Sequence, residues 1–196
     1  MKTILTLFIF FSASLVFGQN WYTVCGNNQK NGVTKMTGPV SIASPYWTAT
    51  SPTATVWGNA VYTFGNKFVS SRGVLSPYRM LVEMRDLTTG DLIWQKTVND
   101  TARLYTVGFT EDAVYAIDYQ GATANLFALT VDSGNVKWSF AAGITSVTTG
   151  ICFAPDGDPI IIGKRLDRKT GTVKWAYNYT IPVSPDGGYV VNGNTY

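Results

Sequence analysis

The chain has 196 residues, of which 45% are hydrophobic and 14% charged, and its formal net charge is +3. Few charges and many aromatic residues argue against a disordered chain. So small a net charge gives no reason to expect a nucleic-acid or membrane surface. The 19 glycines, together with many β-branched and aromatic residues, favour a single all-β domain. The absence of histidine excludes Ser-His-Asp and Cys-His catalytic centres and the usual His-containing catalytic zinc sites.

Residues 1–18 have the pattern of a secretory signal peptide. Lys2 supplies a positive charge, and "ILTLFIFFSASLVF" is an apolar run of 14 residues that ends before the small residue Gly18. The run is short of the ~20 residues that a membrane-spanning helix needs. We therefore expect cleavage before Gln19, a secreted or periplasmic protein, and no membrane span once the signal is removed.

The rest of the chain, residues 19–196, contains short apolar strand patterns in a repeating order. They are "NAVYTFG" near Val61, "DAVYAID" near Val114, "DPIIIG" near Ile160 and "GGYVVNG" near Val190. A second strand follows in two of these units, as "MLVEMRD" and "NLFALTV". The unit that contains Ile160 is short, and we expect its sheet to be reduced or badly formed, because it lacks room for a hairpin between its first two strands.

Each of three units then continues with a Thr/Ser-Gly turn and a strand that carries tryptophan. Trp94, Trp138 and Trp175 are spaced 44 and 37 residues apart, and Trp47 stands 47 residues before Trp94. Repeats of about 40–50 residues are typical of propeller blades. A new blade is expected to begin near residue 184.

The residue types of the turn have a physical reason. Gly90, Gly134 and Gly171 provide the positive φ that a short hairpin loop requires. Asp86 and Asp167 stand four residues before their glycine, where a carboxylate accepts hydrogen bonds from backbone N–H groups of the turn. Thr89, Ser133 and Thr170 are expected to do the same more weakly.

The tryptophans have two possible roles. By alternation along a strand, Leu92 and Trp94 share one face, and the same holds for the equivalent pairs in the two later units. This phase favours a packing residue that fills the space between neighbouring blades. The alternative is a set of exposed rings that stack on a sugar, which would indicate a carbohydrate-binding sheet protein.

The motif resembles the repeat signature of the PQQ-type, or quinoprotein-like, β-propellers, Ala-x-Asp-x-x-Thr-Gly-x-x-x-Trp. The first turn matches it fully from the Asp onward, the second has Thr130 and Ser133 in place of Asp and Thr, and the third has Arg165 in place of Ala. The motif residues are Asp86, Thr89, Gly90, Trp94, Ser133, Gly134, Trp138, Asp167, Thr170, Gly171 and Trp175.

The resemblance covers roughly residues 56–196 and implies four-stranded antiparallel blades in which each tryptophan docks one blade onto the next. Propellers of this family usually have seven or eight blades, and this chain has about four. The sequence therefore predicts a partial or open propeller.

The resemblance does not extend to the residues that bind the quinone cofactor. The quinone-dependent members of the family cover the ring with adjacent cysteines, whereas Cys25 and Cys152 are far apart in this sequence. These two cysteines are expected to be separate buried thiols, with a disulfide as the alternative in an exported protein. "PDGDP" at residues 155–159 could suggest a metal loop but favours a turn, because "SPDGG" at residues 184–188 repeats it without the second Asp. "GNNQKNG" at residues 26–32 lacks the context of a phosphate-binding loop.

The sequence predicts no catalytic, cofactor or metal residue. The preferred interpretation is an exported, non-catalytic propeller that acts as a scaffold or protein-binding module, whose partner is a protein or further propeller blades. Two alternatives stay open. One is a fragment of a quinone-dependent or carbohydrate-active enzyme, and the other is the carbohydrate-binding protein described above.

Overall fold

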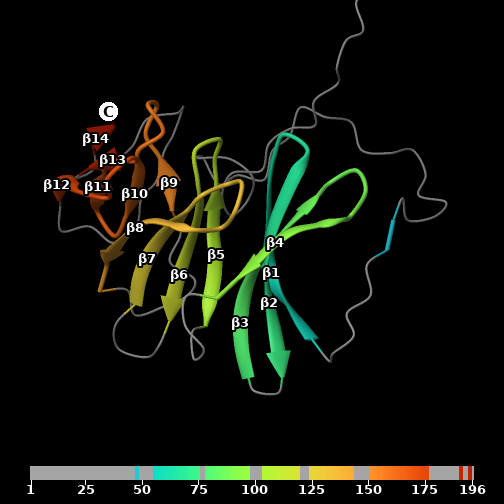
Figure 1. Ribbon diagram of the computed structural model, residues 1–196. Coiled ribbons are helices and arrows are strands. Elements are labelled where there is room, and N and C mark those ends of the chain that lie inside the picture. The colour runs from blue at the N-terminus through green and yellow to red at the C-terminus, as the bar shows by residue number, and fades with distance from the viewer. Residues whose placement is uncertain are drawn as a thin grey trace, which may run out of the picture.

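The computed structural model describes residues 47–48, 55–75, 78–97, 103–119, 124–143, 151–176, 190–191 and 194–195. The expected signal peptide, Cys25, and the stretches at residues 26–32 and 184–188 lie outside the described residues. Within the described ranges every regular element is a β-strand (Figure 1).

Twelve of the strands form three antiparallel sheets of four, each in simple sequence order. The first contains β1 (Thr55–Phe64), β2 (Lys67–Leu75), β3 (Tyr78–Asp86) and β4 (Leu92–Lys96). The second contains β5 (Leu104–Phe109), β6 (Val114–Tyr119), β7 (Ala124–Leu129) and β8 (Val136–Ala141). The third contains β9 (Cys152–Phe153), β10 (Pro159–Ile161), β11 (Lys164–Leu166) and β12 (Val173–Ala176). A short hairpin pairs β13 (Val190–Val191) with β14 (Asn194–Thr195).

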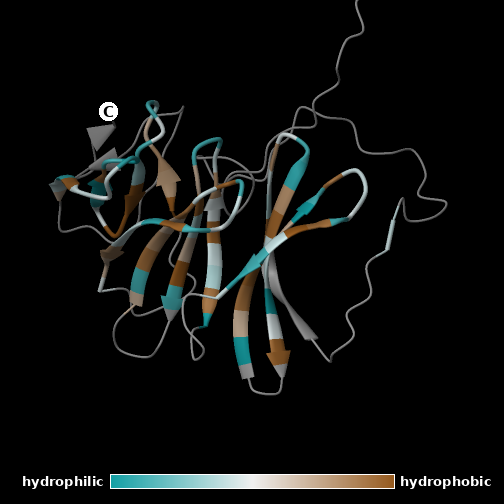
Figure 2. Cartoon of the chain, viewed as in Figure 1, coloured by the Kyte–Doolittle hydropathy of each residue, from teal (hydrophilic) through white to brown (hydrophobic). Residues whose placement is uncertain are grey.

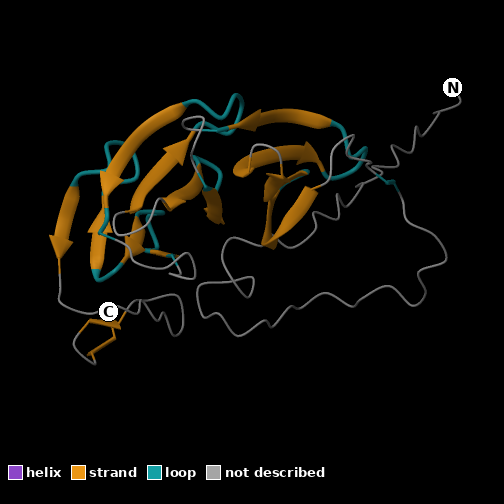
Figure 3. Ribbon diagram, turned by 90° about the horizontal axis from the view of Figure 1, so that it is seen from below, coloured by secondary structure: helices purple, strands orange, loops and turns teal. Residues whose placement is uncertain are grey.

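The three sheets stand side by side in chain order, as Figures 1 and 3 show from two directions. One core cluster joins the first sheet to the second, through residues such as Met84, Trp94 and Phe109. Another joins the second sheet to the third, through residues such as Tyr115, Trp138 and Leu166. Hydrophobic residues concentrate on the strands and hydrophilic ones in the turns (Figure 2).

The middle sheet is buried on both faces, which explains its continuous apolar strands. Along β6, Val114 and Ala116 belong to the core shared with the first sheet. Tyr115 and Ile117, which alternate with them, belong to the core shared with the third. A strand covered on both sides has no polar face, so alternation of polar and apolar residues disappears from its sequence.

Four-stranded antiparallel meanders packed face to face along the chain are the architecture of propeller blades. The expected fold class, an all-β partial propeller with four-stranded antiparallel blades, is confirmed by these sheets.

The strand order within the units differs from the expectation. "NAVYTFG" contributes to β1, the first strand of its sheet, whereas "DAVYAID" forms β6, the second strand of the next. "MLVEMRD" and "NLFALTV" contribute to third strands, β3 and β7. The two "AVY" stretches look alike because both end in a buried tyrosine, Tyr62 or Tyr115, and burial does not depend on a strand's rank in its sheet.

The short unit has all four strands, which corrects the expectation that it would lack a hairpin, but its strands are reduced to between two and four residues. Cys152 and Phe153 supply the first strand, and "DPIIIG" contributes the second rather than the first. A two-residue turn at Ile162 and Gly163, with φ of 47° and 62°, joins β10 to β11. Positive φ at both central residues is the tightest way to close a hairpin. Ile162 adopts it despite its branched Cβ, and its side chain packs against the core between the second and third sheets.

Candidate functional site

The three Thr/Ser-Gly turns have one backbone geometry. In each, the glycine N–H donates to the carbonyl of the residue four positions earlier, at 2.9, 2.9 and 2.8 Å in chain order. That earlier residue donates its own N–H to the carbonyl five positions later, at 3.0, 2.8 and 2.8 Å. Gly90, Gly134 and Gly171 have φ of 78°, 67° and 74°, the positive values that the sequence predicts.

The first residue of the turn organises it through its side chain. Asp86 Oδ1 accepts hydrogen bonds from the N–H groups of Thr88 and Thr89, at 2.7 and 2.9 Å. Asp167 Oδ1 accepts the equivalent bonds from Lys169 and Thr170, at 2.9 and 3.0 Å. These two bonds lower the pKa of Asp167 to about 2, since they stabilise its charged form.

The hydroxyls add weaker bonds to the same turns. Thr89 Oγ1 accepts from the Asp91 N–H at 3.2 Å, and Thr170 Oγ1 accepts from the Thr172 N–H at 3.4 Å. In the second turn Thr130 takes the aspartate's place, and its hydroxyl contacts Ser133 Oγ at 2.8 Å. The expected role of Ser133 as a backbone acceptor is therefore replaced by a contact between two side chains.

Each turn also receives a tryptophan from the preceding part of the chain. The indole N–H of Trp47 donates to Leu87 O at 2.9 Å, that of Trp94 to Val131 O at 2.8 Å, and that of Trp138 to Arg168 O at 3.0 Å. All three acceptors lie inside a Gly turn of the next sheet. The donor and acceptor are 30 to 40 residues apart in the sequence.

The indole ring lies directly on the glycine of that turn. A Cβ added to Gly90, Gly134 or Gly171 would stand 2.6, 2.7 or 2.6 Å from a ring carbon of Trp47, Trp94 or Trp138. Real Cβ atoms do not approach so closely, so the ring excludes any side chain there. Glycine is thus required twice, by its φ and by the ring, and sequence reasoning found only the first requirement.

The tryptophans differ in burial. Trp94 and Trp138 are only 8% and 7% exposed, as a packing role between blades requires. Trp175 is half-buried and packs against the cluster of Cys152, Ala154 and Ile160 on the other face of the third sheet. Burial of Trp94 and Trp138 argues against stacking of these two rings on a sugar.

A repeated β-bulge corrects the expectation that Leu92 and Trp94 share a face. Trp94 pairs with Met84, but Leu92 pairs with the next residue, Arg85, so Ile93 is an extra residue in β4. The same shift precedes Trp138 in β8 and Trp175 in β12. A bulge breaks the two-residue alternation, and as a result Leu92, Val136 and Val173 are 46%, 49% and 45% exposed.

A buried carboxylate ties together the strands of the third sheet. Asp158 is 1% exposed. Its Oδ2 accepts from Arg165 Nε at 2.8 Å and from Lys174 Nζ at 2.7 Å, and its Oδ1 accepts from the Arg168 N–H at 3.0 Å. Burial raises the pKa of Asp158, but these bonds from Lys174, Arg168 and Arg165 outweigh it and hold the pKa below its usual value.

The "PDGDP" stretch is therefore a turn between β9 and β10, the interpretation that the sequence favours. Gly157 has φ of 86° and donates to Ala154 O at 2.8 Å. Asp156 pairs with Arg165. Both carboxylates of the stretch thus face positively charged side chains rather than each other.

A second buried carboxylate, Glu83, lies in the first sheet and is fully buried. Arg85 donates to one of its oxygens, and Arg72 Nε lies 2.9 Å from the other. Arg72 also donates to Gln95 on β4 at 3.1 Å. Sequence reasoning missed this cluster, because only the register of β2, β3 and β4 brings its members onto one face.

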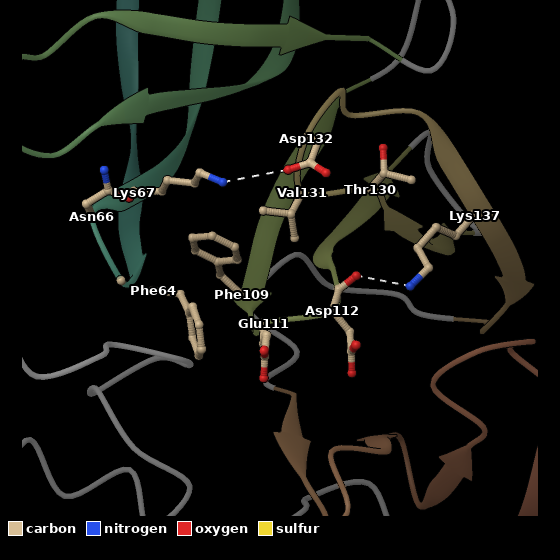
Figure 4. Close-up of a pocket in the computed structure, with 11 residues that line it drawn as sticks. Phe64, Asn66, Lys67, Phe109, Glu111, Asp112, Thr130, Val131, Asp132 and Lys137 are labelled. Atoms are coloured by element: carbon tan, nitrogen blue, oxygen red, sulfur yellow. Dashed lines mark hydrogen bonds and ion pairs between the residues drawn. The ribbon is translucent and has the colours of Figure 1, made fainter.

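A cleft of about 530 Å³ opens between the turns of the first and second sheets (Figure 4). Phe64 and Phe109 form an aromatic wall, with ring centroids 6.0 Å apart. Its other lining side chains are mostly charged and come from the β1–β2, β5–β6 and β7–β8 turns and from β2 and β8. They include Lys67, Glu111, Asp112, Asp132 and Lys137.

Several of these charged side chains already have bonded partners. Lys67 Nζ lies 3.7 Å from Asp132 Oδ1, which connects the first sheet to the second. Lys137 donates to the backbone carbonyl of Asp112 at 3.0 Å, and the Asp112 carboxylate pairs with Arg168 of the third sheet. The cleft is thus a charged surface on which side chains of both signs alternate.

The described residues contain no group of three or more His, Cys, Asp or Glu side chains that could hold a metal ion. Cys152 is buried in β9, and its possible partner Cys25 is outside the described residues. No described helix is long and apolar enough to cross a membrane.

Comparison with known proteins returns no matching family model and no matching curated protein. Among solved structures, the chain is similar to BamB from Moraxella catarrhalis, with a TM-score of 0.42 and 23% sequence identity. The match covers 61% of this chain and 36% of that structure, so the chain spans well under two thirds of BamB's length.

Proposed function

We propose that this chain is an exported, non-catalytic propeller repeat protein of the PQQ-like kind, which acts as a scaffold and binds protein. The observation that carries the proposal is that the residues of the repeated motif all make structural contacts. Its aspartates close turns, its glycines accept indole rings, and Trp94 and Trp138 join one sheet to the next.

Two buried carboxylates outside the motif support the same role. Asp158 and Glu83 are 1% and 0% exposed, and both have cationic partners. Each is bonded to groups that hold strands of its own sheet together. A general acid or base must instead reach a reacting group, so these contacts favour a structural use.

The cleft of Figure 4 is the surface that we assign to the protein partner. Its volume falls within the range of binding pockets, but its alternating charges resemble the rim of a protein interface more than an apolar ligand site. Export follows from residues 1–18, which we propose to be a cleaved signal peptide, and residues 19–196 then form the partial propeller.

The proposal is tested by photo-crosslinking in living cells. A photoreactive amino acid in place of the exposed Glu111 is expected to capture a protein partner, and Asp132→Arg in the same chain is expected to lower the yield. The control is the same amino acid in place of Ser139, which is exposed on β8 away from the cleft lining. The purified protein is also expected to begin at Gln19. Equal adducts from both positions, or none from position 111, would contradict the proposal.

A further inference from the structure

The tryptophan joints between the sheets are geometrically alike. Trp47, Trp94 and Trp138 each place their ring on the glycine of a turn, 2.6 or 2.7 Å from a Cβ built there. Each indole N–H also donates to a turn carbonyl, at 2.9, 2.8 and 3.0 Å. A joint that repeats in this way does not distinguish one sheet from another. Sheets that are exposed during folding can therefore dock wrongly, also between copies, which is a characteristic failure of repeat proteins.

The joint between the first and second sheets contains a buried hydroxyl pair in addition to the tryptophan. Ser71 on β2 is 3% exposed, and Thr106 on β5 is 6% exposed. The Thr106 N–H donates to Ser71 Oγ at 2.7 Å, and the two hydroxyl oxygens lie 3.0 Å apart. Two hydroxyls and one backbone N–H thus satisfy one another between two sheets that otherwise meet through a hydrophobic core.

The corresponding positions of the next joint carry isoleucine. When β4 and β8 are aligned on their tryptophans, Ile117 on β6 takes the place of Ser71 on β2. On the facing side, β9 and β5 are the first strands of their sheets, and Ile151 stands directly before β9. Both isoleucines are 0% exposed and belong to the core between the second and third sheets. The two joints therefore share the tryptophan contact but differ in polarity at these positions.

Mismatched sheets would leave buried polar groups without partners. If the Ser71 face of a first sheet met the isoleucine of a third sheet, the serine hydroxyl would be buried alone. If the Ile117 face of a second sheet met Thr106 of another copy, the Thr106 N–H and hydroxyl would lose their partner. A buried group without its hydrogen bond incurs the full desolvation penalty, and such a penalty against the wrong partner is a source of specificity.

We propose that Ser71 and Thr106 determine which sheets dock together. The hydroxyl pair favours the second sheet on the first and disfavours docking of either one onto a wrong sheet of another copy. Both are positioning residues, since they act through the packing of the sheets. The inference does not depend on the proposed function, because it concerns assembly of the propeller and not what the propeller binds.

Refolding at a series of protein concentrations tests the inference. The purified protein is unfolded in urea, diluted and separated by size-exclusion chromatography with light scattering, and each variant is compared with wild type. Ser71→Ala should raise the ratio of oligomer to monomer about tenfold, the factor that corresponds to one orphaned buried group. Thr106→Val should do the same, and both ratios should grow with concentration. Thr106→Ser keeps the hydroxyl and the N–H, so it should refold as wild type does.

Ile117→Ala is the control for lost stability. It should weaken the joint between the second and third sheets, but it leaves the polarity of both joints unchanged. It should therefore lower the urea midpoint without the same rise in oligomer. Circular dichroism of the monomer peak establishes that each variant is folded. An unchanged ratio in either Ser71→Ala or Thr106→Val would overturn the proposal. An equal rise in Ile117→Ala would also overturn it, because lost stability alone would then explain the association.

Discussion

At the residue scale, the glycine of the repeated turn carries two separate constraints. Gly134 has φ of 67°, and an added Cβ would meet the Trp94 ring at 2.7 Å. Gly143 has nearly the same φ, 63°, but an added Cβ would meet nothing within 4 Å. The two glycines therefore separate the backbone requirement from the ring contact.

Alanine should lower the free energy of unfolding more at Gly134 than at Gly143. Gly143→Ala should lower the free energy of unfolding by about 1–2 kcal/mol, the cost of an L-residue in the left-handed region. Gly134→Ala should cost a further 1–3 kcal/mol or so, because the methyl group overpacks against the indole ring. Urea unfolding of both variants measures the difference. Equal losses would mean that the ring moves away at no cost.

At the element scale, the third sheet has strands of only two to four residues, and a charge network connects them. Asp158, just before β10, binds Arg165 on β11 and Lys174 on β12. Short ladders contribute few backbone hydrogen bonds, so the side-chain bonds carry more of the sheet's cohesion.

The network makes stability depend on pH. The pKa of Asp158 is lower in the folded protein than the ordinary value of 3.8. Its contribution is therefore complete above that value and is lost as the pH falls through the folded pKa. Asp158→Asn should cost roughly 2–3 kcal/mol at neutral pH, since it leaves Arg165 and Lys174 without their anion, and it should flatten the fall in stability toward acid.

Urea unfolding at a series of pH values measures this effect. Asp132→Asn is the control, because the Asp132 side chain is 95% exposed and its pair with Lys67 is long. Asp167 also has a lowered pKa, so some acid sensitivity should remain in the Asp158→Asn protein. An unchanged pH profile would show that the network adds nothing to stability.

At the scale of the whole molecule, the sheets are joined in series. Trp94 links the first sheet to the second and Trp138 links the second to the third, each through a ring contact and an indole hydrogen bond. Trp175 occupies the equivalent position of the third sheet but is only half-buried.

Replacement of each tryptophan by alanine should lower the free energy of unfolding, and the loss should be larger for the two buried rings than for Trp175. Trp94→Ala and Trp138→Ala should each cost about 3–5 kcal/mol, typical of a large ring removed from a core, and Trp175→Ala should cost less. Trp94→Phe, which keeps an aromatic ring but not the N–H donor, should lie between alanine and wild type. Thermal and urea unfolding give the values. A stability near wild type for Trp94→Ala would refute the docking role.

The sequence by itself determined the local parts of this protein. The turns could be predicted because their bonds join residues within five positions of one another, such as Asp86 and Asp91. Gly90, Gly134 and Gly171 adopt the expected positive φ for the same local reason. The spacing of the tryptophans indicated separate sheets, since the repeat length reflects one folded unit.

Only the tertiary structure decided what those parts touch. The bulge that exposes Leu92 appears only when β4 is paired with β3. The carbonyl that receives Trp94 is 37 residues away, in the next sheet. The cleft beside Lys67 and Asp132 likewise requires two sheets to be in place. Such contacts depend on register and packing between distant segments, and a pattern read along one strand contains no information about its distant neighbour.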